Sequence, residues 1–188
     1  MQKIILASQS PRRRELLHLA EIDFEVIVAD TDESFSAGLS FEETAIHIAR
    51  NKALAVAAKN ETDKIIVAAD TIVICDNKII GKPIDRENAI EIITALSGNT
   101  HQVITGVHMI KGDKETSFAD TTSVTFHTLS EAQIIYYVDK YKPYDKAGAY
   151  AIQEWIGAIG IKNINGDFYN VMGLPISRVV TALNDFSL

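Results

Sequence analysis

The stretch IIVAADTIVIC, residues 65–75, decides how this chain folds. Almost every side chain in it is apolar and most are β-branched, which is typical of a strand buried on both faces. Asp76 and Asn77 follow as a turn, and the apolar residues after Lys78 predict a short returning strand. One position in the stretch breaks the pattern, because Asp70 places a carboxylate in its middle.

Strand-like and helix-like patterns alternate on both sides of this stretch. Upstream we expect strands at residues 3–7 and 24–28, a helix opened by Ser10 and Pro11, and a helix over 41–59 with a Ser40–Glu43 capping box. Downstream we expect a helix capped by Asp85, a hairpin of residues 100–110 and 115–126, a helix boxed by Ser130 and Gln133, a strand near 157–164, and a last helix opened by Pro175. The pattern predicts an α/β fold, a mixed twisted sheet with flanking helices, in a single domain over residues 1–188.

Composition excludes several classes of protein. The chain has 188 residues, of which 47% are hydrophobic and 23% charged, as in ordinary globular proteins. Its 18 basic and 25 acidic residues give a net charge of −7, which opposes general binding to nucleic acid. A single cysteine, Cys75, excludes an internal disulfide, and no apolar run of about 18 residues predicts a membrane span. We expect a cytoplasmic protein with no nucleic-acid or membrane partner.

Three arginines open the first predicted helix. Arg12, Arg13 and Arg14 follow Ser8 and Ser10 at a helix N-terminus that already carries partial positive charge. Free backbone N–H groups and forked guanidinium donors at such a place suit phosphate oxygens. The alternative is that the arginines bend into water or pair with a neighbouring glutamate.

Two further charges interrupt apolar patterns. Burying the Asp70 carboxylate without a partner costs several kcal/mol, so a metal ion, a lysine or a water held for deprotonation is expected beside it. Lys52 shares the inward face of its helix with Ile48 and Val56, at i, i+4 and i+8. The alternatives are a structural, hydrogen-bonded Asp70 and a Lys52 that extends to solvent from the edge of the apolar face.

Lys82 and Glu33 complete the set of candidate charges. Lys82 follows the short strand in Gly81-Lys82-Pro83, which lacks the spacing of a Walker A loop, so it either points into a cleft or is an exposed turn lysine. Glu33 lies with Asp30 and Asp32 after the second strand, where surface charge is the ordinary reading. Carboxylates, cations and a water together are what a divalent metal with a polyphosphate requires.

With these residues in view, the chain resembles the Maf family of nucleoside triphosphate pyrophosphatases, whose fold is similar to that of inosine triphosphate pyrophosphatases. The resemblance runs from Ile4 to Leu183. It rests on LASQSPRRRELL (residues 6–17), AADT (68–71), GKP (81–83), LSG (96–98) with residues 101–107, DKAGAY (145–150) and GDFYNVMGLP (166–175).

The resemblance implies two lobes around a central cleft, a homodimer, and hydrolysis of a nucleoside triphosphate to the monophosphate and pyrophosphate. It implies a divalent cation, Mg²⁺ or Mn²⁺, held by Glu33 and Asp70, with Asp70 also the proton acceptor. The residues expected to bind phosphate are Ser8, Ser10, Arg13, Lys52 and Lys82.

The resemblance further assigns base selectivity to Arg12, Thr71 and Gln153. The run Ala151-Ile152-Gln153 is similar to the subgroup acting on dTTP and UTP rather than on 7-methyl-GTP. A glutamine amide both donates and accepts, which complements the imide of uracil or thymine. Because Asp70 and Thr71 are adjacent, an unkinked strand sends them to opposite faces, so we expect either a bend or an indirect role for Thr71.

Two other functions stay open at the level of sequence. One is a non-catalytic, nucleotide-binding regulator of cell division and septum formation, although a carboxylate facing a triphosphate repels it unless metal chemistry compensates. The other is a pyrophosphatase for another modified nucleotide, such as 7-methyl-GTP. The assignment to dTTP and UTP itself extends to modified pyrimidine nucleotides.

Overall fold

The computed structural model describes residues 3–31, 38–60 and 62–187 of the chain. The chain divides into two compact units: unit 1 comprises Met1–Thr71, Thr105–Asp120 and Gly173–Leu188, and unit 2 comprises Ile72–Ile104 and Thr121–Met172. The division falls inside three long strands, β3 (Ile66–Cys75), β5 (Thr100–Lys111) and β6 (Lys114–Phe126). The strand order is β2-β1-β3-β5-β6-β7, with β4 paired to β3. The sequence prediction of a mixed sheet with flanking helices is confirmed.

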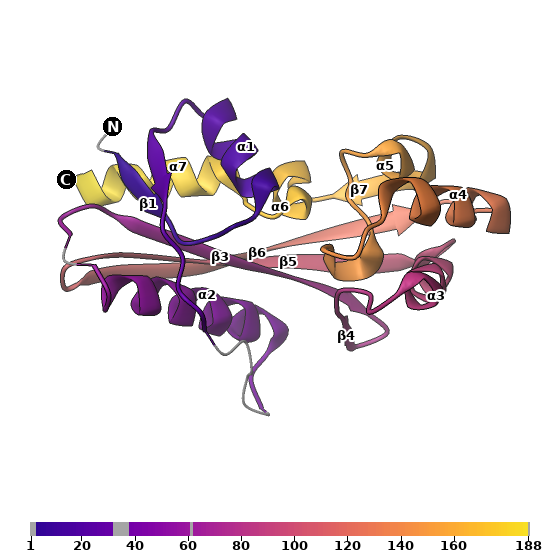
Figure 1. Cartoon of the computed structure of the whole chain (residues 1–188), viewed down its shortest axis with the longest axis horizontal. Helices are drawn as coiled ribbons and strands as arrows, with labels where there is room; N and C mark the ends of the chain where they lie inside the picture. Colours follow the sequence, from indigo (N-terminus) through magenta and orange to yellow (C-terminus); the bar gives the residue numbers. More distant parts are fainter. Residues whose placement is uncertain (1–2, 32–37, 61, 188) are drawn as a thin grey trace. The chain divides into compact units, whose positions relative to one another are not determined.

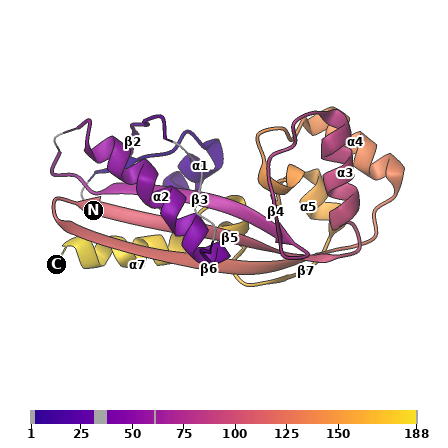
Figure 2. The same ribbon diagram turned by 90° about the horizontal axis from the view of Figure 1, so that it is seen from below.

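Unit 1 is a sheet covered by helices on both faces. It contains β1 (Ile4–Leu6), α1 (Pro11–Leu19), β2 (Phe24–Val26), α2 (Phe41–Ala57), α7 (Ile176–Ser187) and parts of the three long strands. Strand β1 runs parallel to β2 and to β3, with Ile5 opposite both Glu25 and Ile66. Helix α2 covers one face of the strands, and α1 and α7 cover the other (Figures 1 and 2).

Helix α2 packs on the sheet at very short range. The Ser40–Glu43 capping box that the sequence predicts opens it, and its small residues Ala45, Ala49 and Ala53 are fully buried. A Cβ added at Gly106 of β5 would lie 2.3 Å from the backbone carbon of Ala45. Since only a glycine at this position lets the helix backbone approach so closely, Gly106 sets the distance between α2 and the sheet.

Unit 2 holds the other ends of the long strands and most of the short elements. These are β4 (Lys78–Ile80), α3 (Arg86–Leu96), α4 (Glu131–Tyr141), the 3₁₀ turn η1 (Ala147–Ala149), α5 (Trp155–Gly160), β7 (Ile161–Asn165) and α6 (Phe168–Met172). Strand β4 pairs antiparallel with β3, and β7 pairs antiparallel with β6. Helices α3 and α4 lie side by side (Figures 1 and 2).

Two local expectations need correction. The strand expected near residues 157–164 is wrong over its first half, because residues 155–160 form α5 and the strand begins only at Ile161. A short apolar run carries too few residues for its period to distinguish a helix from a strand. Ser10 does precede α1, but within the described residues its side chain makes no capping bond. Among these residues no helix has the length and apolar character needed to cross a bilayer.

Candidate functional site

The Asp70 carboxylate and the Lys52 ammonium form an ion pair within unit 1. Lys52 Nζ donates to Asp70 Oδ1 at 2.6 Å, and the two side chains are 17% and 15% exposed. Lys52 comes from α2, where its neighbours Ile48 and Val56 along the same face are buried against the sheet. Of the partners that the sequence left open for a carboxylate in β3, a lysine is therefore present.

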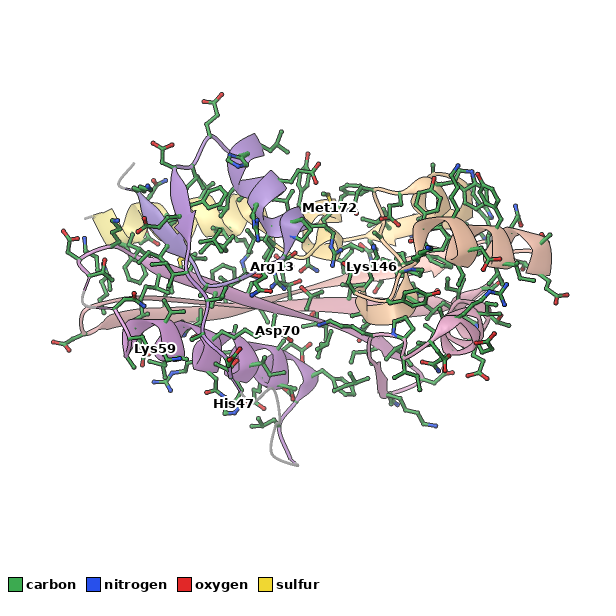
Figure 3. All side chains as sticks on the ribbon, in the orientation of Figure 1. Arg13, His47, Lys59, Asp70, Lys146 and Met172 are labelled. Atoms are coloured by element: carbon green, nitrogen blue, oxygen red, sulfur yellow. The ribbon has the colours of Figure 1, made fainter. Side chains whose placement is uncertain are left out.

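Arg13 forms a second centre in unit 1. Its guanidinium is buried and donates through three different nitrogens: Nε to the Gly173 carbonyl at 2.8 Å, Nη1 to Ser8 Oγ at 2.9 Å, and Nη2 to Thr71 Oγ1 at 3.0 Å. Thr71 also shares a hydrogen bond with Thr105 at 2.9 Å. Figure 3 labels Arg13 beside α1 and Asp70 on β3. Arg13 thus joins the β1–α1 loop, β3 and the segment before α7.

Asp70 and Thr71 lie on opposite faces of β3, as the alternation of a strand predicts. Asp70 reaches Lys52 on the α2 side, whereas Thr71 reaches Arg13 on the α1 side. Since adjacent residues contact helices on different faces, β3 keeps its ordinary pleat here. The Thr71 hydroxyl therefore contacts Arg13 and Thr105 on the α1 side, on the opposite face from the Lys52–Asp70 ion pair.

The remaining residues around the start of α1 are arranged about Ser8. Ser8 is buried, and its hydroxyl accepts from the Ser10 backbone N–H at 3.3 Å as well as from Arg13. Arg14 donates to the Gln9 carbonyl at 2.9 Å, and Arg12 is partly exposed. The first turn of α1, all of which is described, contains no acidic residue. Three cations and the positive end of the helix dipole therefore share one end of α1.

Lys82 and Gln153 belong to unit 2, and both side chains are exposed. Lys82 follows Gly81, whose carbonyl accepts from the Gly148 N–H at 3.2 Å. Glu33, expected as a metal ligand, lies outside the described residues. Across the residues that the structure does describe, no group of three or more His, Cys, Asp or Glu side chains could hold a metal ion.

Sequence reasoning missed a buried polar network in unit 2. Tyr137 donates to Glu154 Oε2, and Lys146 Nζ lies 3.6 Å from Glu154 Oε1. Burial is the largest cause of the raised pKa of Tyr137, and the hydrogen bond to Glu154 raises it further. Tyr137 sits among the apolar residues of α4, so its spacing predicts only a core position. The motif DKAGAY contained Lys146, but nothing in the spacing paired it with Glu154.

The two histidines of β5 make contacts inside the fold. His101 is buried, hydrogen-bonds the Tyr150 hydroxyl at 2.8 Å, and meets the ring of Phe126 edge-on. Burial lowers the pKa of His101 to about 4. His108 bonds Ser117 through Nδ1 at 2.7 Å.

Comparison with solved structures first identifies the class of fold. The Ham1 protein of Staphylococcus aureus matches with a TM-score of 0.54 and 19% identity, over 100% of both chains. This likeness shows that the mixed sheet and its helices have a Ham1-like fold, which agrees with the fold expected from the family resemblance.

Comparison of sequences then identifies the family. The chain belongs to the Maf family, since the model for Maf-like protein matches residues 3–186. The dTTP/UTP pyrophosphatase of Parabacteroides distasonis is 49% identical over 185 residues, which are 98% of this chain and 96% of that protein. The dTTP/UTP pyrophosphatase of Bacillus velezensis is 46% identical over 187 residues, covering 100% and 98%.

Proposed function

We propose that this chain is a nucleoside triphosphate pyrophosphatase that hydrolyses dTTP and UTP to the monophosphate and pyrophosphate. The observation that carries the proposal is the Lys52–Asp70 pair at 2.6 Å in the middle of an otherwise apolar strand. Relatives at 46–49% identity that bear the name dTTP/UTP pyrophosphatase support the same reaction.

Asp70 acts in this proposal as the proton acceptor. Its carboxylate is largely withdrawn from solvent, and the Lys52 ammonium holds it in one orientation. A water beside Asp70 attacks the α-phosphorus; the new P–O bond forms as the bond from that phosphorus to the bridging oxygen breaks. Pyrophosphate leaves, and the proton of the water passes to Asp70.

Cations and backbone N–H groups offset the charge of the triphosphate in this reaction. Lys52 is close enough to Asp70 to contact a phosphate at the reacting centre, and Lys82 supplies an exposed ammonium. Arg13 has bonds to Ser8 and Gly173, so it holds the β1–α1 loop in place while its charge adds to the positive end of α1. Ser8 and Ser10 complete the phosphate-binding loop in this proposal.

The proposal includes a divalent cation held by Asp70, Glu33 and substrate phosphates, since the described residues alone do not group three metal ligands. Magnesium is commonly held by one or two carboxylates together with substrate phosphates. Asp70 offers a carboxylate with more acceptor positions than Lys52 uses, and Glu33 is the second expected ligand. When bound, Mg²⁺ or Mn²⁺ supplies positive charge that withdraws electron density from the phosphoryl group.

Base selectivity is assigned to Gln153, with Arg12 and Thr71. The exposed amide of Gln153 can accept from the N3–H and donate to a carbonyl of uracil or thymine. Thr71 acts indirectly in this proposal, through its bond to Arg13. The homodimer and the cytoplasmic location implied by the family resemblance stay predictions.

The test is a panel of dTTP, UTP, dCTP and 7-methyl-GTP incubated with Mg²⁺ or Mn²⁺, with monophosphate and pyrophosphate quantified. We expect turnover of dTTP and UTP that Asp70→Asn abolishes. Asp85→Asn is the matched control, because Asp85 caps α3 by accepting from the Asn88 N–H and asparagine caps equally well. Full turnover by Asp70→Asn would refute the proton-acceptor role.

The other outcomes separate the competing functions. Binding of nucleotide without any monophosphate would point to a non-catalytic regulator of cell division. A preference for 7-methyl-GTP would keep the reaction and overturn the base assignment. In the second case Gln153→Glu would leave the substrate preference unchanged, whereas the proposal expects it to weaken use of dTTP and UTP.

A further inference from the structure

The turn that carries Gln153 is fixed by buried neighbours and by a backbone hydrogen bond. Its neighbours Ala151 and Ile152 are buried, while Gln153 is exposed. The Glu154 N–H closes the turn by donating to the Ala151 carbonyl at 3.1 Å. A Cβ added at Gly157 would lie 1.7 Å from the Ile152 carbonyl oxygen, so the backbone that follows packs directly on the turn.

One hydroxyl connects the two ends of this turn. Tyr137 of α4 is fully buried; its hydroxyl donates to Glu154 Oε2 and accepts from the Ala151 N–H at 3.2 Å. Its ring stacks on that of Tyr141, with 5.0 Å between centroids. A tyrosine hydroxyl is a donor at neutral pH, and burial together with Glu154 raises the Tyr137 pKa further above the neutral range.

Lys146 links the same turn to the loop that carries Lys82. Its side chain is 11% exposed, with Nζ 2.8 Å from Asp145 Oδ1 and 3.6 Å from Glu154 Oε1. Two residues on, the Gly148 N–H donates to the Gly81 carbonyl. Gly148 has φ +71°, and a Cβ there would lie 3.0 Å from a Val73 methyl. The segment from Lys146 to Gly148 therefore contacts both loops at fixed points.

We propose that Tyr137, Glu154 and Lys146 form a brace that positions Gln153 relative to the Gly81–Lys82 loop and so sets base selectivity. All of these residues belong to unit 2. The inference rests on the proposed function, because it concerns how the base of a nucleoside triphosphate is chosen. The three are positioning residues that act through Gln153.

The brace affects recognition of the base more than the chemistry at phosphorus. Gln153 can make two complementary hydrogen bonds to a pyrimidine imide only in one orientation, whereas the proposed proton acceptor Asp70 belongs to unit 1. Removing the Tyr137 hydroxyl leaves the Ala151 N–H and Glu154 Oε2 without this partner. We expect the turn to loosen, so that selectivity falls and KM rises while kcat changes little.

The experiment compares Tyr137→Phe with the matched control Tyr141→Phe, which removes a hydroxyl from the ring stacked on Tyr137. For Tyr137→Phe we expect the ratio of kcat/KM for dTTP to that for dCTP to fall about tenfold, as for a buried polar group left unpaired, with kcat within about twofold. Glu154→Ala should reproduce this loss, and Glu154→Gln, which keeps an acceptor, should restore most of the ratio. A ratio does not depend on the fraction of folded protein, so lost stability alone leaves it unchanged.

A second readout needs no activity. Trp155, the one tryptophan in the sequence, directly follows Glu154, so quenching of its fluorescence by acrylamide reports on the turn. We expect stronger quenching in Tyr137→Phe and wild-type quenching in Tyr141→Phe.

The two readouts separate failure of the brace from failure of the proposed function. Unchanged quenching in Tyr137→Phe would overturn the brace whatever the activity. Stronger quenching with an unchanged ratio, beside an active wild-type chain, would overturn its role in selectivity. No turnover of any pyrimidine triphosphate by the wild-type chain would refute the proposed function, and with it the selectivity role.

Discussion

Replacing Arg13 with lysine tests whether its guanidinium is chiefly an internal anchor. Three nitrogens of Arg13 reach acceptors on Gly173, Ser8 and Thr71, at 2.8–3.0 Å. A single lysine nitrogen at the end of a flexible stem can reach one of these acceptors but not all three. Two lost hydrogen bonds at about 1–1.5 kcal/mol each predict that Arg13→Lys lowers the free energy of unfolding by about 2–3 kcal/mol.

Urea unfolding followed by circular dichroism measures this effect, with Arg14→Lys as the control. Arg14 makes its bond to the Gln9 carbonyl in an exposed setting, so its replacement should change the free energy of unfolding by less than about 0.5 kcal/mol. A loss of about 2–3 kcal/mol in Arg13→Lys corresponds to a melting temperature lower by about 4–12 °C for a chain of this size. Equal stability of the two variants would refute the anchor. Wild-type stability with lost turnover in Arg13→Lys would instead make Arg13 a direct phosphate ligand.

Three further predictions concern pH, packing and metal. Burial lowers the pKa of His101 to about 4, against 6.5 when unfolded. Below pH 6.5 the unfolded chain therefore binds a proton more readily than the folded chain, so stability is full above pH 6.5 and is lost as the pH falls toward 4. His101→Gln should reduce by about 3 kcal/mol the loss of unfolding free energy between pH 7 and 4. Gly106→Ala, whose methyl would meet the α2 backbone at 2.3 Å, should lower the free energy of unfolding by about 3 kcal/mol. In the control Gly81→Ala, the added Cβ has no described atom within 4 Å apart from its chain neighbours, so the free energy of unfolding should change by less than about 0.5 kcal/mol. Dialysis against EDTA should abolish turnover, with Mg²⁺ restoring it, and should leave the urea midpoint unchanged; full turnover after dialysis would refute the metal requirement.

Local signals in the sequence predicted the local structure well. Both capping boxes, Ser40–Glu43 and Ser130–Gln133, form as predicted, because their donors and acceptors lie three residues apart on one helix turn. The charges that interrupt apolar patterns were also informative. Asp70 and Lys52 each violated the periodicity of their own element, and the structure shows that they contact each other. Pairing resolves both violations at once, since neither charge is left buried alone.

Contacts between distant segments could not be predicted in this way. Arg13 bonds the carbonyl of Gly173, 160 residues further along the chain, and a backbone carbonyl leaves no mark on the sequence. Tyr137 and Glu154 are 17 residues apart and on different elements. Each has an unremarkable local setting, so only the folded chain shows that they are partners.

The position of β3 in the sheet explains how neighbouring residues can serve different helices. Its pairing with β1 places Ile66 opposite Ile5 and Val67 opposite Leu6, and from this register the pleat directs Asp70 to α2 and Thr71 to α1. A shift of one residue would exchange the two faces. The carboxylate would then face the Arg13 side, and the hydroxyl would face Lys52. Such a shift would separate the Asp70 carboxylate from the Lys52 ammonium and leave a buried charge without its partner, which is costly. The ion pair on which the proposed chemistry depends therefore itself favours the observed register.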